Sequence, residues 1–466
     1  MDAWQKAAID YIQSWLEHQM RVSQLPGCLV AIAHRDKVVA EFAFGHADLA
    51  TGEKLTPRHR FRIASHSKSF TSAGLMKLRE QRKLRLDDPV GDYVKGLHGQ
   101  VAQTTIAQLM SHSAGLTRDG VDSGQFTDDR PFLNTAKLMA ELQMPPAIDP
   151  GARLKYSNHG YALLGLVIEA ITGEPYRDWI AREVVAALGL AETEPDMPLV
   201  KAAPLAQGHT PRLPLQRRLV IPGDTPTNAM VSAAGFVGTA ADIARFFAQL
   251  APRARGSILS AASRREMTRR HWRNPHASVE SYYGLGIMSG STAGWDWFGH
   301  TGKLHGYVSR TLAIPACDLT FSIFTNASDG WAEAWGDGGL QILRTFATHG
   351  APQRPVRDWN GRWWTSWSAT DLVPLGDRVL AGNPQLIHPF ADAAVIEVTG
   401  RDSGLIGAAA GYASHGEPVR RVRDKAGKVT EVWLGGARLR PEKALVAVME
   451  RRFGSDKASK KPRVRH

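Results

Sequence analysis

The chain of 466 residues is longer than one ordinary domain core requires, so we expect two or three domains. Its 43% hydrophobic and 22% charged residues are typical of a globular protein and exclude wholesale disorder. The net charge of +12 could suggest a nucleic-acid partner, but the excess arginine and lysine lies in residues 253–273 and 451–466, with no nucleic-acid-binding motif beside either stretch. We interpret both stretches as solvated surface.

The first 20 residues favour a helix rather than a targeting or membrane segment. Apolar side chains recur at helical spacing from Trp4 to Leu16, while charged residues such as Lys6 and Asp10 interrupt any signal-peptide core. No apolar run approaches the roughly 18 residues that a membrane span needs. We therefore expect no membrane association and a cytoplasmic location.

Strand and helix patterns follow in turn along the next part of the chain. Residues 28–48 predict a β-hairpin, and the period becomes helical from Ser65 to about Arg79. In the middle third, the clearest helices are predicted at about Asn158–Thr172, Tyr176–Leu188 and Ala240–Leu250.

Strand patterns return near residue 282 and are followed by a helix at about Trp331–Thr348. This order predicts one sheet whose strands come from both ends of the segment, with a helical insertion between them. We predict a first domain over residues 1–350, with its sheet from about 1–64 and 282–350 and its helical part at about 65–281. A linker at 351–356, a β domain at 357–455 and a basic disordered tail at 456–466 are predicted to follow.

Short β-like runs at turn spacing predict a small antiparallel barrel or sandwich after the linker. Four tryptophans, at positions 359, 363, 364 and 367, are expected in its core.

Ser65 and Lys68 form the only S-x-x-K of the chain, at the start of a predicted helix. Their spacing places both side chains on one face, so the amine can reach the hydroxyl. Serine is a poor nucleophile until a base takes its proton, and a lysine serves as that base only when its charge is suppressed. The motif alone is a weak signal, because a serine at a helix start is more often an N-cap.

Two further motifs strengthen the assignment. "KYSNHG" holds the only Y-x-N, Tyr156 to Asn158, and "FGHTGKLHG" holds the only H-T-G, His300 to Gly302. Together with framing phrases such as "TTIAQLMSHSAGL" and "SAAGFVGTAADIARF", the set resembles the penicillin-recognising serine hydrolases related to class C β-lactamases. The resemblance extends from about Leu25 to Ser328.

The resemblance implies an α/β (α+β) fold with an antiparallel sheet flanked by helices and an all-helical subdomain. It also implies roles for single residues. Ser65 would become acylated, and either Lys68 or Tyr156 would act as the general base, with Lys68 or His300 as the cation that stabilises a Tyr156 phenolate.

Further residues would bind the substrate. The resemblance gives this role to Asn158, Thr301, Gly302 and Lys303, and the backbone N–H groups of Ser65 and Lys303 would form an oxyanion hole. His112, in "SHSAGL", is expected to support the cleft from a turn rather than to take part in chemistry.

His300 stands where the β-lactamases carry lysine, which resembles the D-Ala-D-Ala carboxypeptidases and D-aminopeptidases of the superfamily. The C-terminal runs resemble the lipocalin-like barrel that D-aminopeptidases carry beside the cleft. We therefore expect a peptidase or amidase acting on short peptides or amides with D-amino acids. A carboxylesterase and a β-lactam or muropeptide sensor without turnover are the alternatives.

Cofactor chemistry is not expected. The 17 histidines include no H-E-x-x-H or comparable metal cluster, "GLGIMSG" has the wrong spacing for a dinucleotide loop, and G-x-S-x-G is absent. The expected partner is a small-molecule substrate, and neither a metal nor a nucleic acid is expected. Self-association into a homo-oligomer is left open.

Overall fold

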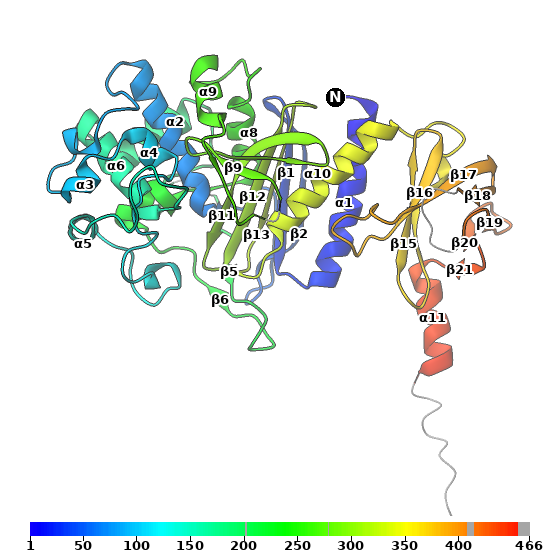
Figure 1. Cartoon of the computed structure of the whole chain (residues 1–466). Coiled ribbons are helices and arrows are strands. Elements are labelled where there is room, and N and C mark those ends of the chain that lie inside the picture. The colour runs from blue at the N-terminus through cyan, green and yellow to red at the C-terminus, as the bar shows by residue number, and fades with distance from the viewer. Residues whose placement is uncertain (201–202, 278, 408–413, 455–466) are drawn as a thin grey trace, which may run out of the picture. The chain divides into compact units, whose positions relative to one another are not determined.

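The contacts within the protein divide it into two units (Figure 1). The structure is a computed structural model and describes residues 1–200, 203–277, 279–407 and 414–454. The larger unit is Ser23–Asp337, and the smaller unit joins Met1–Val22 to the chain from Gly338 onward. The predicted basic tail at 456–466 lies outside the described residues.

The larger unit is built on a nine-stranded sheet in which all neighbouring strands are antiparallel. Its spatial order, β3-β2-β1-β13-β12-β11-β10-β9-β8, joins strands from both ends of the unit, as the sequence pattern predicts. The strands are β1 (Gly27–His34), β2 (Lys37–Asp48), β3 (Glu53–Lys54), β8 (Trp272–Arg273), β9 (Ser281–Tyr283), β10 (Met288–Thr292), β11 (Trp295–Leu304), β12 (Tyr307–Ile314) and β13 (Leu319–Thr325).

Helices and two short ribbons complete this unit. The ribbons pair β4 (Phe61–Arg62) with β7 (Val237–Gly238) and β5 (Gly208–His209) with β6 (Val220–Ile221). The α-helices are α2 (Ser67–Glu80), α3 (Gly99–Ala102), α4 (Ile106–Met110), α5 (Thr135–Leu142), α6 (Asn158–Thr172), α7 (Tyr176–Ile180), α8 (Ala240–Gln249) and α9 (Ala261–Thr268).

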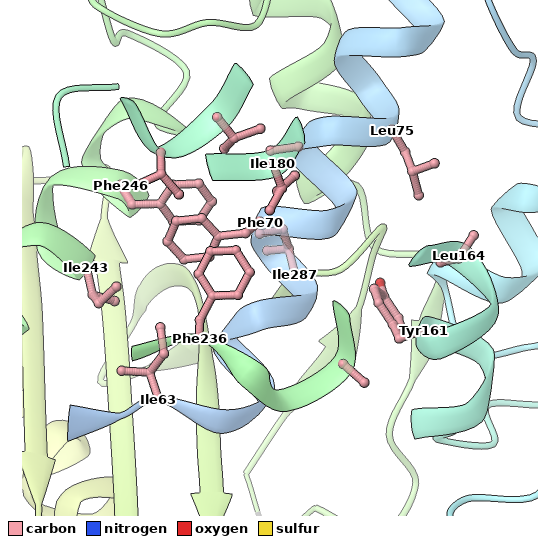
Figure 2. Close-up of a cluster of buried hydrophobic side chains, with 14 of the residues drawn as sticks. Ile63, Phe70, Leu75, Tyr161, Leu164, Ile180, Phe236, Ile243, Phe246 and Ile287 are labelled. Carbon is pink, nitrogen blue, oxygen red and sulfur yellow. The ribbon is translucent and has the colours of Figure 1, made fainter. Parts of the chain in front are cut away.

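Aromatic packing fixes helix α2 between the sheet and the other helices. Helix α8 packs on β1 and β13, and Phe70 of α2 stacks on Phe246 of α8 at 3.8 Å and on Phe236 at 4.4 Å between ring centroids. Figure 2 shows these three rings in contact, with Ile63 close to Phe236. Because Phe70 follows Ser65 and Lys68 by less than two turns, this packing also positions the S-x-x-K motif.

The strand that leads to Ser65 is anchored by buried arginines. The Arg62 guanidinium, 1% exposed, donates to the carbonyl oxygens of Gly223 and Thr225 and lies 3.4 Å from the Asp196 carboxylate. Arg60, equally buried, donates to Glu194 at 2.6 Å. Charged groups at this depth are stabilised only when they are paired and hydrogen-bonded.

The smaller unit contains a nearly closed antiparallel barrel of eight strands in sequential order. Trp364 and Arg440 exchange backbone hydrogen bonds of 2.8 and 2.9 Å, which join the end of the first strand to the residue after the last. The elements are β14 (Gly361–Trp364), β15 (Ala369–Leu375), β16 (Arg378–Gly382), β17 (Ala394–Gly400), β18 (Ser403–Ile406), β19 (Pro418–Arg423), β20 (Val429–Leu434), β21 (Ala437–Leu439) and α11 (Glu442–Phe453).

The N-terminal helix α1 (Ala3–Ser23) groups with this barrel, together with most of α10 (Ala332–His349), although the predicted division at 351–356 assigned both helices to the first domain. Side chains of α1 hold the barrel's connecting segment: the Trp15 indole donates to the Leu386 carbonyl at 3.1 Å. Sequence patterns carry no information on such long-range contacts.

The helix predicted at about Tyr176–Leu188 is confirmed as helical from Tyr176 to Ala186, with α7 followed directly by a π-helix over Ala181–Ala186. Other local predictions were wrong, since helix α11 occupies the end of the predicted β domain. Trp359 and Trp363 lie in the barrel core as predicted, but Trp364 is half-buried and Trp367 is 92% exposed.

The basic stretch 253–273 is also not uniformly solvated, because Arg264 is 6% exposed and donates to four backbone carbonyls. In the described ranges, no helix is both long and apolar enough to cross a lipid bilayer.

Replacing Asp196 tests the anchor of the strand before Ser65. Asp196→Ala leaves the buried Arg62 guanidinium without its carboxylate and removes the acceptor of the Thr227 N–H. We expect a loss of about 3–5 kcal/mol in the free energy of unfolding of the larger unit, measured by urea titration. Asp87→Ala, which breaks an ion pair exposed on both sides, is the matched control and should leave the urea midpoint unchanged. Equal midpoints for both variants would contradict the anchor.

Candidate active site

The turn that carries Ser65 is a strained junction between strand and helix. Strand β4 passes into a 3₁₀ turn, Ala64–His66, that leads directly into α2, and Ala64 adopts a left-handed conformation with φ of 48°. A non-glycine residue in this region costs roughly 1–3 kcal/mol, and such strain is concentrated at functional sites. The Ser65 hydroxyl does not cap the helix, because neither the 3₁₀ turn nor α2 has a side-chain cap hydrogen bond.

Lys68 is held in the interior by three hydrogen-bond partners. Its Nζ lies 3.1 Å from Ser65 Oγ, 2.7 Å from Asn158 Oδ1 and 2.8 Å from the Ala233 carbonyl oxygen. The uncharged amine donates its two N–H groups to Asn158 and Ala233 and accepts the Ser65 hydroxyl proton. The side chain is 0% exposed, and this burial lowers the pKa of the amine well below its usual value. The uncharged amine is therefore accessible at far lower pH than in an exposed lysine.

Tyr156 and Asn158 come from the loop that opens helix α6. Ser157 is the N-cap, and its hydroxyl accepts the Gly160 N–H, so the residues on either side of it are fixed. The Tyr156 hydroxyl donates to Ser65 Oγ at 2.8 Å. Burial raises the pKa of Tyr156, so the phenol stays protonated at neutral pH.

His112 supports this loop, as expected from its turn. Its Nδ1 accepts the Ser157 N–H at 3.1 Å, and its ring lies 4.1 Å from the Tyr156 ring between centroids. Burial lowers the pKa of His112, which keeps the imidazole neutral and able to accept.

Asp119 is a member of the site that the motifs do not reveal. It accepts from Asn158 Nδ2 at 2.6 Å and lies 3.1 Å from the Arg118 guanidinium. The carboxylate thus orients the amide so that its oxygen faces Lys68, and its charge opposes the effect of burial on the Lys68 pKa. Its only sequence signal is an acidic residue shortly after "SHSAGL".

Strand β11 brings the H-T-G motif next to the Ser65 turn. Strand β11 pairs with β12 on one side along its length, but its pairing with β10 on the other side ends at Gly299. From His300 onward, this second edge of β11 is therefore open, and β11 contacts the Ser65 turn. A Cβ at Gly302 would lie 2.1 Å from the Ile63 carbonyl oxygen, so only glycine permits this approach.

His300 does not present a cation. Its Nε2 lies 2.9 Å from the Tyr283 hydroxyl and its Nδ1 2.6 Å from the Thr301 carbonyl, an arrangement that fits the neutral tautomer with the proton on Nδ1. Burial lowers the pKa of His300 well below its usual value, and His66 lowers it further. These contacts argue against His300 as the cation that would stabilise a Tyr156 phenolate. Tyr283, which the motifs do not reveal, is the partner of His300.

These residues border a cleft of about 700 Å³. Ser65, Tyr156, Asn158, His300, Thr301 and Lys303 all line it. Lys68 lies behind them, and the exposed Lys303 amine pairs with Glu333 at 3.3 Å. Within the described part of the chain, no cluster of three or more His, Cys, Asp or Glu could hold a metal ion.

Fold and site together define a serine hydrolase. The sequence matches the Beta-lactamase family over residues 12–338, and the chain belongs to this family. A curated relative, Protein flp of Staphylococcus aureus, is 30% identical over 189 residues, which are 39% of this chain. The match spans only 37% of the length of that relative.

Two solved structures show the same fold at low identity. An octameric penicillin-binding protein homologue from Pyrococcus abyssi is 21% identical with a TM-score of 0.65, covering 92% of this chain and 99% of its own. The D-amino acid amidase from Ochrobactrum anthropi SV3, in complex with D-phenylalanine, is 21% identical with a TM-score of 0.63, covering 72% and 99%.

The charge of Asp119 should set the acid limb of Ser65 reactivity. Only the uncharged Lys68 amine accepts a proton, so the labelling rate with a fluorophosphonate should rise with pH through the lowered pKa of Lys68. Asp119→Asn keeps an acceptor for Asn158 but removes the negative charge that favours the ammonium. The pKa of Lys68 falls further, and the acid limb shifts to lower pH.

Asp122→Asn is the matched control, since Asp122 lies in the same loop and pairs with Arg130 away from the site. Its pH profile should overlay that of the wild type. An Asp119→Asn limb that stays in place or moves to higher pH would contradict the electrostatic role of Asp119.

Proposed function

We propose that the protein hydrolyses short peptides or amides that contain D-amino acids, through an acyl-enzyme on Ser65. The observation that supports this most directly is the Ser65 hydroxyl between two groups that exchange protons, Lys68 Nζ at 3.1 Å and the Tyr156 hydroxyl at 2.8 Å. A nucleophile, a base and an acid within hydrogen-bond reach meet the geometric requirement for acyl transfer.

The directions of two pKa shifts support an assignment of the proton carriers. Lys68, whose pKa is lowered, takes the Ser65 proton as Oγ attacks the carbonyl carbon. Tyr156, whose pKa is raised, stays protonated and gives its proton to the leaving nitrogen, and the proton on Lys68 replaces it. Water then attacks the acyl-enzyme by the reverse of these steps: Tyr156 takes a proton from the water as it passes its own to Lys68, and Lys68 returns a proton to Ser65 Oγ as the acyl group leaves.

The oxyanion of the tetrahedral intermediate would be bound by the backbone N–H groups of Ser65 and Lys303. The open edge of β11 beside the Ser65 turn supports this assignment. Each such donor is typically worth about 3–4 kcal/mol in the transition state.

Amide substrates fit the site better than β-lactams. The neutral His300 supplies no fixed positive charge for a β-lactam carboxylate. The similar structures include a D-amino acid amidase and a D-stereospecific amidohydrolase from Streptomyces sp., which supports the same substrate class for this chain. The octameric homologue from Pyrococcus abyssi supports self-association in the same way.

Ser65→Ala should abolish labelling by a fluorophosphonate and lower the hydrolysis of D-alanine p-nitroanilide by about 10⁶-fold, because the nucleophile is lost. In the wild type, D-alanine p-nitroanilide should be cleaved faster than its L-enantiomer and faster than p-nitrophenyl butyrate. Rates are measured by release of the chromophore.

Ser69→Ala is the matched control, since Ser69 lies on the same helix but donates to the Gly286 carbonyl, away from Lys68. It should retain labelling. Labelling of Ser65→Ala at the wild-type rate would refute the nucleophile. Faster ester cleavage would replace the amidase by a carboxylesterase, and stoichiometric labelling without turnover of any substrate would indicate a sensor.

A further inference from the structure

A second, smaller cavity of about 30 Å³ adjoins the catalytic cleft. Phe126, Leu304 and His305 line both spaces and form the shared wall. The volume is that of roughly two water molecules, so the cavity suits a small terminal group and not a whole side chain of a substrate.

Buried hydrogen-bond donors line this side pocket. Gln125 is 2% exposed, and its Oε1 accepts the Leu133 N–H at 3.0 Å. Because that contact requires the oxygen, the amide nitrogen faces the other way, and Nε2 makes no hydrogen bond with any described residue. A buried amide nitrogen without a partner is costly, typically by about 1–3 kcal/mol.

Two further lining residues repeat this feature. Arg62 is 1% exposed, and its terminal nitrogens are engaged by Asp196 and two carbonyls, while Nε has no partner among the described residues. Nδ1 of His305 is buried and likewise makes no hydrogen bond in the described part of the chain. Residues that line this small pocket therefore carry three buried nitrogens without a hydrogen-bond partner in the described part of the chain: Gln125 Nε2 and Arg62 Nε are donors, and His305 Nδ1 donates in the tautomer that carries its proton there.

We infer that this side pocket is a substrate subsite that binds the oxygen of a terminal carboxylate or carbonyl group, through Gln125 Nε2 with Arg62 Nε and His305 Nδ1. The apolar side chains of Phe126, Phe132 and Leu304 form part of the remaining wall, and the exposed Asp128 carboxylate, Thr225 and Tyr307 also line it. The inference rests on the proposed function, because it assigns the subsite to a peptide or amide held at Ser65. It extends that function by requiring a second acceptor group in the preferred substrate.

Calorimetric binding to Ser65→Ala, which does not turn over, tests the subsite. The probes share a D-alanyl group: D-alanyl-glycine has a terminal carboxylate, its methyl ester a neutral carbonyl, and D-alanyl-ethylamide neither. D-alanyl-glycine should bind about fivefold or more tightly than the ethylamide, the gain expected of a hydrogen bond to a charged group. If the methyl ester also binds more tightly than the ethylamide, the neutral carbonyl is sufficient for recognition. If only D-alanyl-glycine does so, the pocket recognises the negative charge; both results support the subsite.

Gln125→Glu in this background retains the acceptor for Leu133 but replaces the donor by a carboxylate oxygen, so the advantage of D-alanyl-glycine should be lost. His305→Leu is the second variant and should reduce it. Gln100→Glu adds the same charge at an exposed position and should preserve it. Thermal unfolding confirms that each variant folds.

Equal binding of all three probes, or an advantage that survives Gln125→Glu and His305→Leu, would overturn the subsite. Failure of the wild type to hydrolyse any D-alanyl amide would refute the proposed function alone, because the calorimetric comparison does not depend on turnover.

Discussion

Burial of the Lys68 amine is the constraint on which the geometry of the site depends. An amine removed from water must find hydrogen-bond partners, and here they come from three parts of the chain: Ser65 beside the same helix, Asn158 at the start of α6 and the carbonyl of Ala233. These contacts draw the elements together, and the same burial lowers the pKa that makes the amine a base. Packing and chemistry therefore have one cause.

A second constraint is the approach of two backbones. Gly302 lets strand β11 come within contact of the Ile63 carbonyl, and the buried pair of Arg62 and Asp196 holds the strand that leads to Ile63. The side pocket uses the same guanidinium, since Arg62 also lines it and its Nε has no hydrogen-bond partner among the described residues. The buried Arg62–Asp196 pair, the turn that carries Ser65 and the side pocket are thus linked through Arg62, and we expect changes at Arg62 to affect both stability and substrate selection.

The sequence predicted the residues whose spacing is local or whose motif is distinctive. Ser65 and Lys68 meet because three residues separate them on a helix. Asp119 and Tyr283 could not be predicted in the same way, because their roles arise from contacts with residues 39 and 17 positions away. Helix α11 was missed because a short amphipathic run is compatible with a strand or a helix. The exposure of Trp367 could not be predicted either, because it depends on how the barrel packs.

The central claim is that the Lys68 amine is uncharged where the enzyme works. The most direct measurement is an NMR titration of the protein carrying ¹³Cε-lysine, with the Lys68 signal assigned by its loss in Lys68→Arg. We expect the Lys68 pKa to lie well below the usual value of a lysine amine and to fall further in Asp119→Asn. A Lys68 signal that titrates together with those of the exposed lysines would contradict it.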